Sequence, residues 1–346
     1  MSNEELSNEE LSNEELSNKE LSNEELSNEE LSNKEMNNVM RIILVCVVMA
    51  TVVCACTKRE RGERGLRSVY YWSTVYELDS AERAFLEREH VGRIYLRYFD
   101  VVVDDEGRVM PNATVRFRSE QPGGVEVVPT IYIMNECMSR DVSQLDSLLL
   151  RRVMQMSETN DITGVREIQI DCDWTMTTRK TYYDFLMRLV ERARNENIQI
   201  STTIRLHQLS QPVPPVERGV LMMYNTGDVR QWDGTNPILD MRDAGPYLRY
   251  LSDYDLPLST AYPVFEWRVL FRDKRFVGIM HSDDDYPVLS GDTIVRREAS
   301  AEVVMEARRA IDNQRTDAND EVILFDLSKT NVQRINKFHY EKAFSD

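Results

Sequence analysis

Eight short, mostly apolar segments separated by helical patterns constrain the fold more than any other feature of this chain. They are residues 68–72, 93–103, 125–135, 167–174, 198–207, 219–225, 258–267 and 321–326. Strands that are apolar on both faces belong to a parallel sheet covered by helices. Eight of them predict a single α/β domain over 67–346, a (β/α)8 TIM barrel. An open doubly wound sheet is the alternative, but no glycine-rich phosphate loop follows the first segment.

Helical patterns fill most of the gaps between these segments. We expect helices over Asp79–Val91, where Asp79 and Glu82 form a capping box, and over 142–157, 179–195, 247–254 and 300–313. Residues 271–297 are expected to form a long connection that acts as a lid or extends a binding groove. Its Asp283–Asp285 run lacks the ligand spacing of a calcium loop, and no cluster has zinc spacing. Neither a metal site nor a cofactor is therefore predicted.

The first 66 residues differ from the rest in composition. Residues 1–35 consist almost wholly of a Ser-Asn-Glu-Glu-Leu repeat, whose five-residue period never aligns the Leu on one helical face, which predicts disorder. Residues 36–55 have the basic start and short apolar run of a signal peptide. The run ends in Val53-Cys54-Ala55-Cys56, which resembles a bacterial lipobox. This predicts a lipid on Cys56, a tether over 56–66 and a cell-envelope location anchored in the membrane; an uncut signal anchor is the alternative.

Two details refine this assignment. Thr57, rather than Asp, follows the lipidated position, which favours the outer membrane in a Gram-negative host. The formal net charge is −17, and most of the acidic excess lies in the repeat. An acidic chain without clustered Lys and Arg is not expected to bind nucleic acid. Cys137 and Cys172 alone remain in the domain, and we expect them to be small buried hydrophobes.

Polar and aromatic side chains gather where the eight segments end. In a TIM barrel these carboxyl ends form the active face. The candidate binding residues are Trp72, Arg97, Asp100, Trp174, Arg205, His207, Tyr224, Asn225, Trp267 and Asp326. The three Trp are expected to ring the mouth, where their faces can stack on sugar rings.

The 167–174 segment carries the sharpest signal. Its alternation places Gln169, Asp171 and Asp173 on the inner face and the apolar residues on the outer face. Two carboxylates in a restricted interior repel each other, which raises at least one pKa towards the range of a proton donor. A structural network with Arg97 or Arg205 is the alternative.

Two motifs resemble family 18 glycoside hydrolases, the chitinase-like barrels. Residues 171–175 (DCDWT) are similar to their D-x-D-W-E, and residues 222–225 (MMYN) are similar to their M-x-Y-D. Nearly the whole mature chain also resembles an uncharacterised family of bacterial TIM-barrel lipoproteins. The chitinase-like resemblance implies a carbohydrate ligand or substrate. Thr175 stands where that family has the Glu that protonates the leaving group, so its mechanism is not expected here unchanged.

Two functions that act on a glycan remain open at this point, besides a scaffold or assembly lipoprotein in which the polar residues at the rim are structural. The first is a glycoside hydrolase with Asp173 and Glu266 as its carboxylate pair, supported by Asp171; these three are the candidate catalytic residues. A retaining mechanism needs carboxyl groups about 5–5.5 Å apart, and an inverting one about 6.5–9.5 Å. The second is a glycan-binding lipoprotein that performs no chemistry. Glu266 can also pair with Arg97 or Arg205 and have no chemical role.

Overall fold

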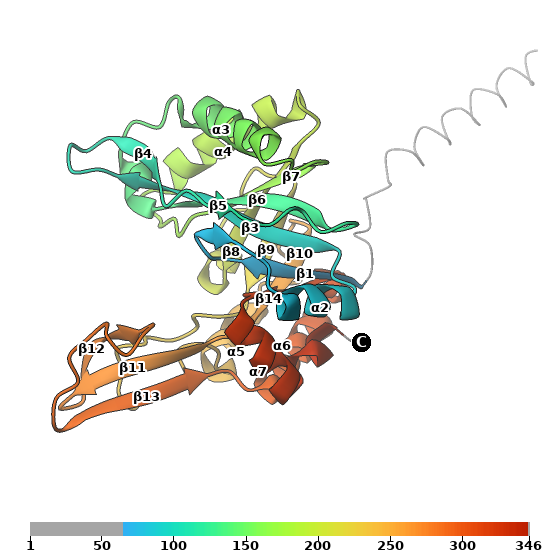
Figure 1. Cartoon of the computed structure of the whole chain (residues 1–346). Coiled ribbons are helices and arrows are strands. Elements are labelled where there is room, and N and C mark those ends of the chain that lie inside the picture. Colours follow the sequence, from blue (N-terminus) through green and yellow to red (C-terminus); the bar gives the residue numbers. More distant parts are fainter. Residues whose placement is uncertain (1–64, 345–346) are drawn as a thin grey trace, which may run out of the picture. The chain divides into compact units, whose positions relative to one another are not determined.

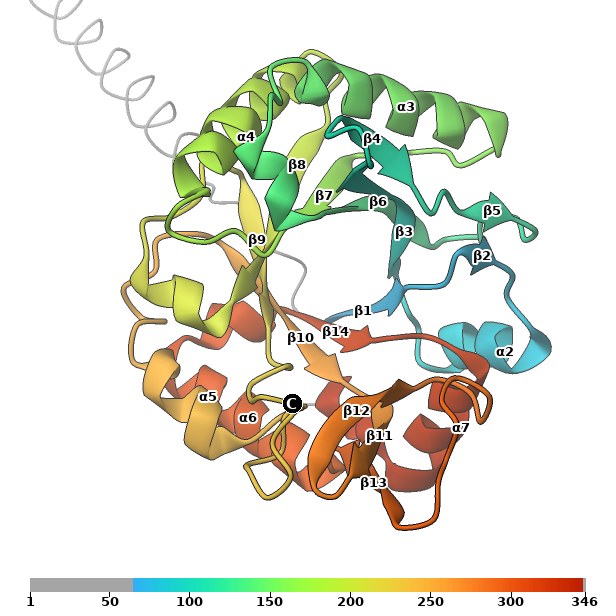
Figure 2. The ribbon, with the colours of Figure 1, turned by 90° about the vertical axis from the view of Figure 1, so that its left-hand side faces the viewer.

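The computed structural model describes residues 65–344 and has the predicted TIM-barrel fold (Figures 1 and 2). The parallel strands are β1 (Leu66–Tyr71), β3 (Arg93–Val103), β6 (Glu126–Ile133), β7 (Glu167–Asp171), β8 (Gln199–Arg205), β9 (Arg218–Met222), β10 (Leu258–Pro263) and β14 (Glu321–Phe325). The barrel closes because β1 pairs with both β14 and β3. The repeat, the apolar run and Cys56 lie outside the described residues.

Alternation along the strands separates two sets of buried side chains. The inner set comprises Tyr70, Tyr95, Val128, Val220, Met222, Tyr224, Ala261 and Ile323. The outer set, such as Ile168 and Ile170 of β7, packs with the surrounding helices in one large cluster. Cys137 and Cys172 belong to this outer cluster as buried free thiols. The interior is therefore a packed core, as expected for a barrel of this size.

Six α-helices are described in residues 65–344: α2 (Ser80–Arg88), α3 (Leu145–Thr159), α4 (Arg179–Arg194), α5 (Met241–Leu248), α6 (Ala301–Gln314) and α7 (Lys329–Phe338). The capping box of α2 is confirmed, since Asp79 accepts from the Glu82 amide and Glu82 accepts from the Asp79 amide. The helix expected over 247–254 lies earlier, because Asp240 caps α5 by accepting from the Arg242 amide. The sequence did not predict α7.

The smaller elements connect these units. Strand β4 (Val109–Asn112) pairs antiparallel with the end of β3, and β2 (Val75–Tyr76) pairs with β5 (Arg116–Phe117). Residues 65–344 also contain four 3-10 helices, η1 (Asn135–Ser139), η2 (Leu206–Ser210), η3 (Thr316–Asn319) and η4 (Tyr340–Phe344). No helix among residues 65–344 is long and apolar enough to cross a membrane.

The prediction for residues 258–297 was wrong in two respects. The seventh barrel strand ends at Pro263, and the expected long loop is an antiparallel sheet of β11 (Glu266–Arg272), β12 (Arg275–Met280) and β13 (Asp292–Glu298). Buried Val269, Leu270 and Phe271 form its core. Gly278 is needed in β12, because a Cβ there would lie 2.3 Å from the Tyr286 ring. The apolar residues of β11 follow β10 closely, so the two strands read as one in the sequence.

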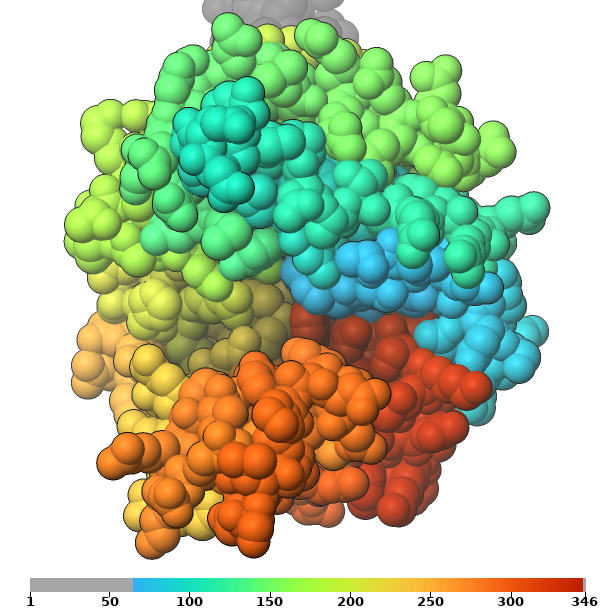
Figure 3. Space-filling view, turned by 60° about the vertical axis from the view of Figure 1, so that its left-hand side comes forward, coloured from blue at the N-terminus to red at the C-terminus, as the bar shows by residue number. Residues whose placement is uncertain are grey.

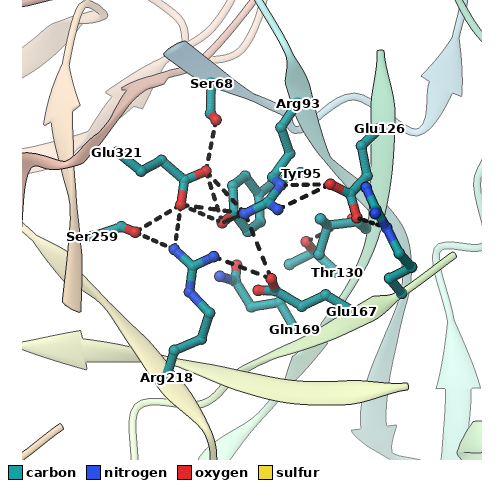
Figure 4. Close-up of polar contacts among 12 residues, drawn as sticks. Ser68, Arg93, Tyr95, Glu126, Thr130, Glu167, Gln169, Arg218, Ser259 and Glu321 are labelled. Atoms are coloured by element: carbon teal, nitrogen blue, oxygen red, sulfur yellow. Dashed lines mark hydrogen bonds and ion pairs between the residues drawn. The ribbon is translucent and has the colours of Figure 1, made fainter. Parts of the chain in front are cut away.

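A network of charged side chains fills the amino end of the barrel (Figure 4). Glu321 accepts hydrogen bonds from Ser68 Oγ (2.6 Å), Ser259 Oγ (2.7 Å) and Tyr95 Oη (3.1 Å). Arg218 and Arg93 pair with both Glu321 and Glu167. Burial by itself would raise the pKa of Glu321, but the two guanidiniums and the two serine hydroxyls outweigh it and hold this pKa at about 2.

Candidate functional site

Strand register assembles a row of polar side chains at the carboxyl end of the barrel. Asp100 of β3 pairs with Asn112 of β4 on one side and with Tyr132 of β6 on the other, and Tyr132 pairs with Asp171 of β7. Burial raises the pKa of Tyr132, and the charges of Asp173 and Asp171 add to the rise. Sequence reasoning missed Tyr132, although it alternates with inward-facing Val128.

Asp171 occupies the interior, as the alternation predicts. It is buried, and its Oδ1 accepts a hydrogen bond from Thr203 Oγ1 at 2.6 Å. Burial raises the pKa of Asp171 and Asp173 adds to the rise, whereas Arg205 opposes it. The predicted direction of the shift is therefore correct, but desolvation causes more of it than repulsion between the two carboxylates.

Asp173, Arg205 and His207 lie together above Asp171. The Asp173 side chain is 47% exposed, and Arg205 Nε donates a hydrogen bond to its Oδ1. His207 is exposed on η2; desolvation by its surroundings lowers its pKa, whereas Asp173 acts in the opposite direction. These three side chains give the mouth an acceptor, a fixed cation and a titratable ring.

Three buried polar atoms at and below this mouth have no hydrogen-bond partner among residues 65–344. They are Tyr224 Oη, Arg205 Nη1 and Gln169 Nε2. Tyr224 is 3% exposed, and burial raises the pKa of its hydroxyl although nearby Arg205 lowers it. Buried donors without a partner are costly, and such atoms gathered in a mouth indicate a site for a polar molecule.

Aromatic rings form the opposite side of the mouth, around Phe325 at the end of β14. The Phe325 ring centroid lies 4.8 Å from that of Tyr224, 5.6 Å from Trp72 and 5.8 Å from Phe265. Trp267 continues the group at 5.5 Å from Phe265. Figure 3 shows a hollow between the N-terminal strands and the β11–β13 sheet, with the β14 region on its floor. The sequence prediction included Trp72 and Trp267 but missed both Phe residues.

Arg97 and Asp100 hold Trp72 in place. The Arg97 guanidinium lies 5.4 Å from the centre of the Trp72 ring and donates to the Trp72 carbonyl at 3.3 Å. Arg97 Nε also donates to Asp100 Oδ1 at 2.8 Å. The guanidinium occupies one face of the indole, so this pair fixes the orientation of the ring.

Trp174 does not join the mouth, which corrects the predicted ring of three Trp. It is 2% exposed and packs edge-on against Tyr183 of α4, with ring centroids 5.4 Å apart. The alternation that directs Asp173 into the mouth directs Trp174 towards the helices. Trp174 is therefore part of the outer core.

Glu266 is bound by other arginines than those considered from the sequence. It starts β11, and Arg334 Nη1 of α7 donates to it at 2.6 Å, while Arg296 lies at 3.6 Å. Arg334 also binds Glu298 at 2.6 Å and the Val264 carbonyl at 3.2 Å. Within the described chain, no hydrogen bond or ion pair joins Glu266 to Asp173. These contacts tie the β11–β13 sheet to α7.

The remaining predicted residues lie at the rim. Asp326 follows β14, accepts from Asn331 Nδ2 at 2.7 Å, and has a pKa that burial raises to about 7. Asn225 is exposed with φ 57°, a left-handed conformation that Asn tolerates. Thr175 is exposed, and its hydroxyl lies 2.9 Å from Thr177 Oγ1. Among residues 65–344, no group of three His, Cys, Asp or Glu side chains could hold a metal ion.

Comparisons with known proteins identify the fold. No protein-family model and no curated protein matches the chain. A chitinase from Chromobacterium violaceum superimposes with TM-score 0.52 and 11% identity, over 81% of this chain and 99% of that one. The C-terminal domain of a putative chitinase from Desulfitobacterium hafniense gives TM-score 0.51 and 8% identity, over 81% and 99%. At such low identity the likeness is one of fold, and the chain has a TIM barrel like those of these two proteins.

Proposed function

We propose that this barrel is a carbohydrate-binding protein that holds its ligand at the carboxyl end of the strands without hydrolysing it. The observation that carries the proposal is the pair of buried donors, Tyr224 Oη and Arg205 Nη1, which have no partner among residues 65–344. They lie near buried Asp171 and below exposed Asp173. Sugar hydroxyl and carbonyl oxygens are suitable acceptors for both donors.

The aromatic side of the mouth supports a sugar ligand in particular. Trp72, Phe325 and Phe265 present ring surfaces beside the polar groups, and pyranose rings have apolar C–H faces that pack on such surfaces. Two solved structures with the same fold carry the names chitinase and putative chitinase.

Two features favour binding over hydrolysis. Thr175 carries a hydroxyl at the position where the sequence resemblance has the acidic Glu, and a hydroxyl cannot protonate a leaving group near neutral pH. Glu266 is held by Arg334 and Arg296 at the base of a separate sheet. A carboxylate that anchors two guanidiniums is a poor nucleophile.

Hydrolysis is the second candidate, because one observation favours it. Burial raises the pKa of Asp171, and the charge of the exposed Asp173 adds to the rise, which favours the protonated form of Asp171 relative to a free carboxyl. If the protein is a hydrolase, Asp173 would act as the acid, and a group other than Glu266 would act as the second carboxylate of the pair.

The location of the protein belongs to the same proposal. Lipidation of Cys56 would anchor the chain in the cell envelope, in the outer membrane of a Gram-negative host. The described chain enters the barrel at the amino end of β1, on the face opposite the mouth. An anchor there would leave the mouth accessible to polymers. Incorporation of a labelled fatty acid, lost in Cys56→Ser, tests this part.

The main test uses the chain from Thr57 onward and a panel of oligosaccharides that includes N-acetylated β-linked ones. We expect binding by calorimetry without products by mass spectrometry, and binding about tenfold weaker in Tyr224→Phe. Products that disappear in Asp173→Asn would establish the hydrolase instead. Absence of binding to every sugar would contradict both functions. Thr175→Glu is the companion variant, since gained hydrolysis would show that the missing acid is what prevents catalysis.

A further inference from the structure

A second row of side chains lies directly above the polar row, and it is apolar. Met110 of β4 pairs with Val102 of β3, and the Met134 amide donates to the Val101 carbonyl, which continues the β3–β6 register by one residue. Met110, Val102 and Met134 therefore lie side by side across three chain segments. We call these three residues the methionine row.

Alternation shows which way the methionine row faces. Phe99 and Val101 belong to the outer cluster, and Val103 packs against it, so Val102 takes the opposite face together with Asp100. Directly opposed residues in an antiparallel pair share a face, so Met110 lies on the same side as Val102. Met134 is two positions after Tyr132, which shares the inner face of β6 with Val128, because Ile131 and Ile133 belong to the outer cluster. The methionine row thus overlooks the mouth about 7 Å above the polar row.

Both methionines of this row are exposed, as are Met176 and Met187 elsewhere on the domain. Met110 is 42% exposed and Met134 is 40% exposed, although the outer faces of the same strands are buried in the core. Figure 2 shows that the β3–β4 hairpin lies across the barrel mouth from the β11–β13 sheet. The mouth therefore has aromatic rings on the β1–β14 side and methionines on the β3–β6 side.

The chemistry of the two sides differs. Flat rings suit the faces of sugar rings, whereas a flexible and polarisable thioether suits a chain that has no fixed shape. The polar row, from Asn112 to Asp171, continues without a break into the methionine row through β3 and β6. A molecule bound at Asp171 and extending outward along β3 meets aliphatic surface next.

We propose that the methionine row is a subsite for an aliphatic acyl or alkyl substituent of the bound carbohydrate. This inference rests on the proposed function, because the sugar part supplies the anchor at Asp171 and Tyr224. It goes further by naming the ligand class: a glycan that carries an apolar chain on the side facing β3.

The test compares methyl and octyl β-glycosides of glucose and of N-acetylglucosamine, below their micelle concentrations, by calorimetry with the chain from Thr57. We expect the octyl compound to bind about tenfold more tightly than the methyl compound of the same sugar. The double variant Met110→Gln/Met134→Gln should reduce this ratio to about two without weakening the methyl glycoside. Met110→Leu/Met134→Leu should retain the full ratio, and Leu148→Gln, at an exposed position of α3, is the matched control.

The outcomes separate the two proposals. Equal binding of the methyl and octyl compounds by the unaltered protein overturns the subsite alone. Failure of both compounds and of every sugar in the panel overturns the proposed function and the subsite with it. An octyl preference that survives the Gln substitutions shows that the chain binds elsewhere. A protein without an octyl preference could still use the methionine row for another partner. Self-association that the Gln variant loses would then assign the row to a second copy of the chain, and binding to phosphatidylcholine vesicles that the Gln variant loses would assign it to a membrane.

Discussion

The two ends of the barrel interior use charged and hydroxyl side chains in opposite ways. At the amino end, Arg93 and Arg218 are matched by Glu167 and Glu321, and serine and tyrosine hydroxyls donate to Glu321, while Glu167 Oε1 is the one carboxylate oxygen of this network without a hydrogen-bond partner among residues 65–344 (Figure 4). At the carboxyl end, Tyr224 Oη and Arg205 Nη1 have no partner within the described chain, and the Asp173 side chain is half exposed.

This difference shows where the fold uses polar groups for its own stability. A closed ion network of buried groups loses much when one member is removed, but it offers little to a ligand. A mouth with unpartnered donors gains little stability from them, and a bound molecule can satisfy them. Similar residue types therefore stabilise the fold at one end and, under the proposed function, bind the ligand at the other.

The largest effect is expected from Arg218→Met at the amino end. The substitution leaves Glu321 and Glu167 with less compensating charge in a buried site, so the free energy of unfolding in urea should fall by about 3–5 kcal/mol. Arg242→Met, at an exposed pair with Asp240, should leave the urea midpoint unchanged. A change in Arg218→Met no larger than in this control would show that the network is not a stabilising unit.

The pH dependence should have opposite signs at the two ends. The pKa of Glu321 is held at about 2, so its stabilising contribution is present above about pH 4.5 and is lost as pH falls towards 2. The pKa of Asp326 is raised to about 7, so its contribution is present below about pH 4 and is lost as pH rises through 7. Asp326→Asn should therefore raise the free energy of unfolding at pH 8 by about 1–3 kcal/mol relative to its effect at pH 4.

Urea unfolding at pH 4, 6 and 8 measures this effect, with Glu321→Gln as the companion variant. Glu321→Gln should be destabilising at pH 6 and 8 and less so at pH 4, where the unfolded carboxyl is largely protonated. An Asp326→Asn variant whose effect is the same at all three pH values would contradict the difference between the ends.

The smallest effects are expected when one tyrosine at each end of the barrel is replaced by phenylalanine. Tyr95→Phe removes a hydroxyl that donates to Glu321, so it should lower the free energy of unfolding by about 1–2 kcal/mol and leave sugar binding unchanged. Tyr224→Phe removes a hydroxyl without a protein partner, so the free energy of unfolding should change by less than about 0.5 kcal/mol while sugar affinity falls. If Tyr224→Phe lowered the free energy of unfolding as much as Tyr95→Phe, the predicted difference between the two ends of the barrel would be contradicted.

The local pattern of apolar and polar residues was sufficient to predict most of the barrel strands. The eight apolar segments were placed within a few residues, because a strand buried on both faces must be apolar along its length. Alternation in β7 correctly directed Asp171 into the interior and Ile170 towards the helices. The capping box of α2 could also be predicted from the sequence, because its two partners are only three residues apart.

Other features depended on contacts between distant residues. Tyr132 enters the site through its register with Asp100 and Asp171, and Glu266 is bound by Arg334, which lies 68 residues later in the chain. Trp174 was placed at the mouth by its position at a strand end, although its alternation already directed it to the helices.

The sequence by itself determined the barrel and the polar character of its carboxyl end, because periodicity and strand ends are local properties. Only the tertiary structure decided which charges are neutralised. Arg218 and Glu321 are 103 residues apart and Arg205 and Asp173 are 32 apart, so ion pairing depends on how the closed sheet brings strands together. The distinction between an amino end where the charged side chains are paired with one another and a mouth with an unpartnered Tyr224 hydroxyl and Arg205 Nη1 is therefore a property of the folded barrel.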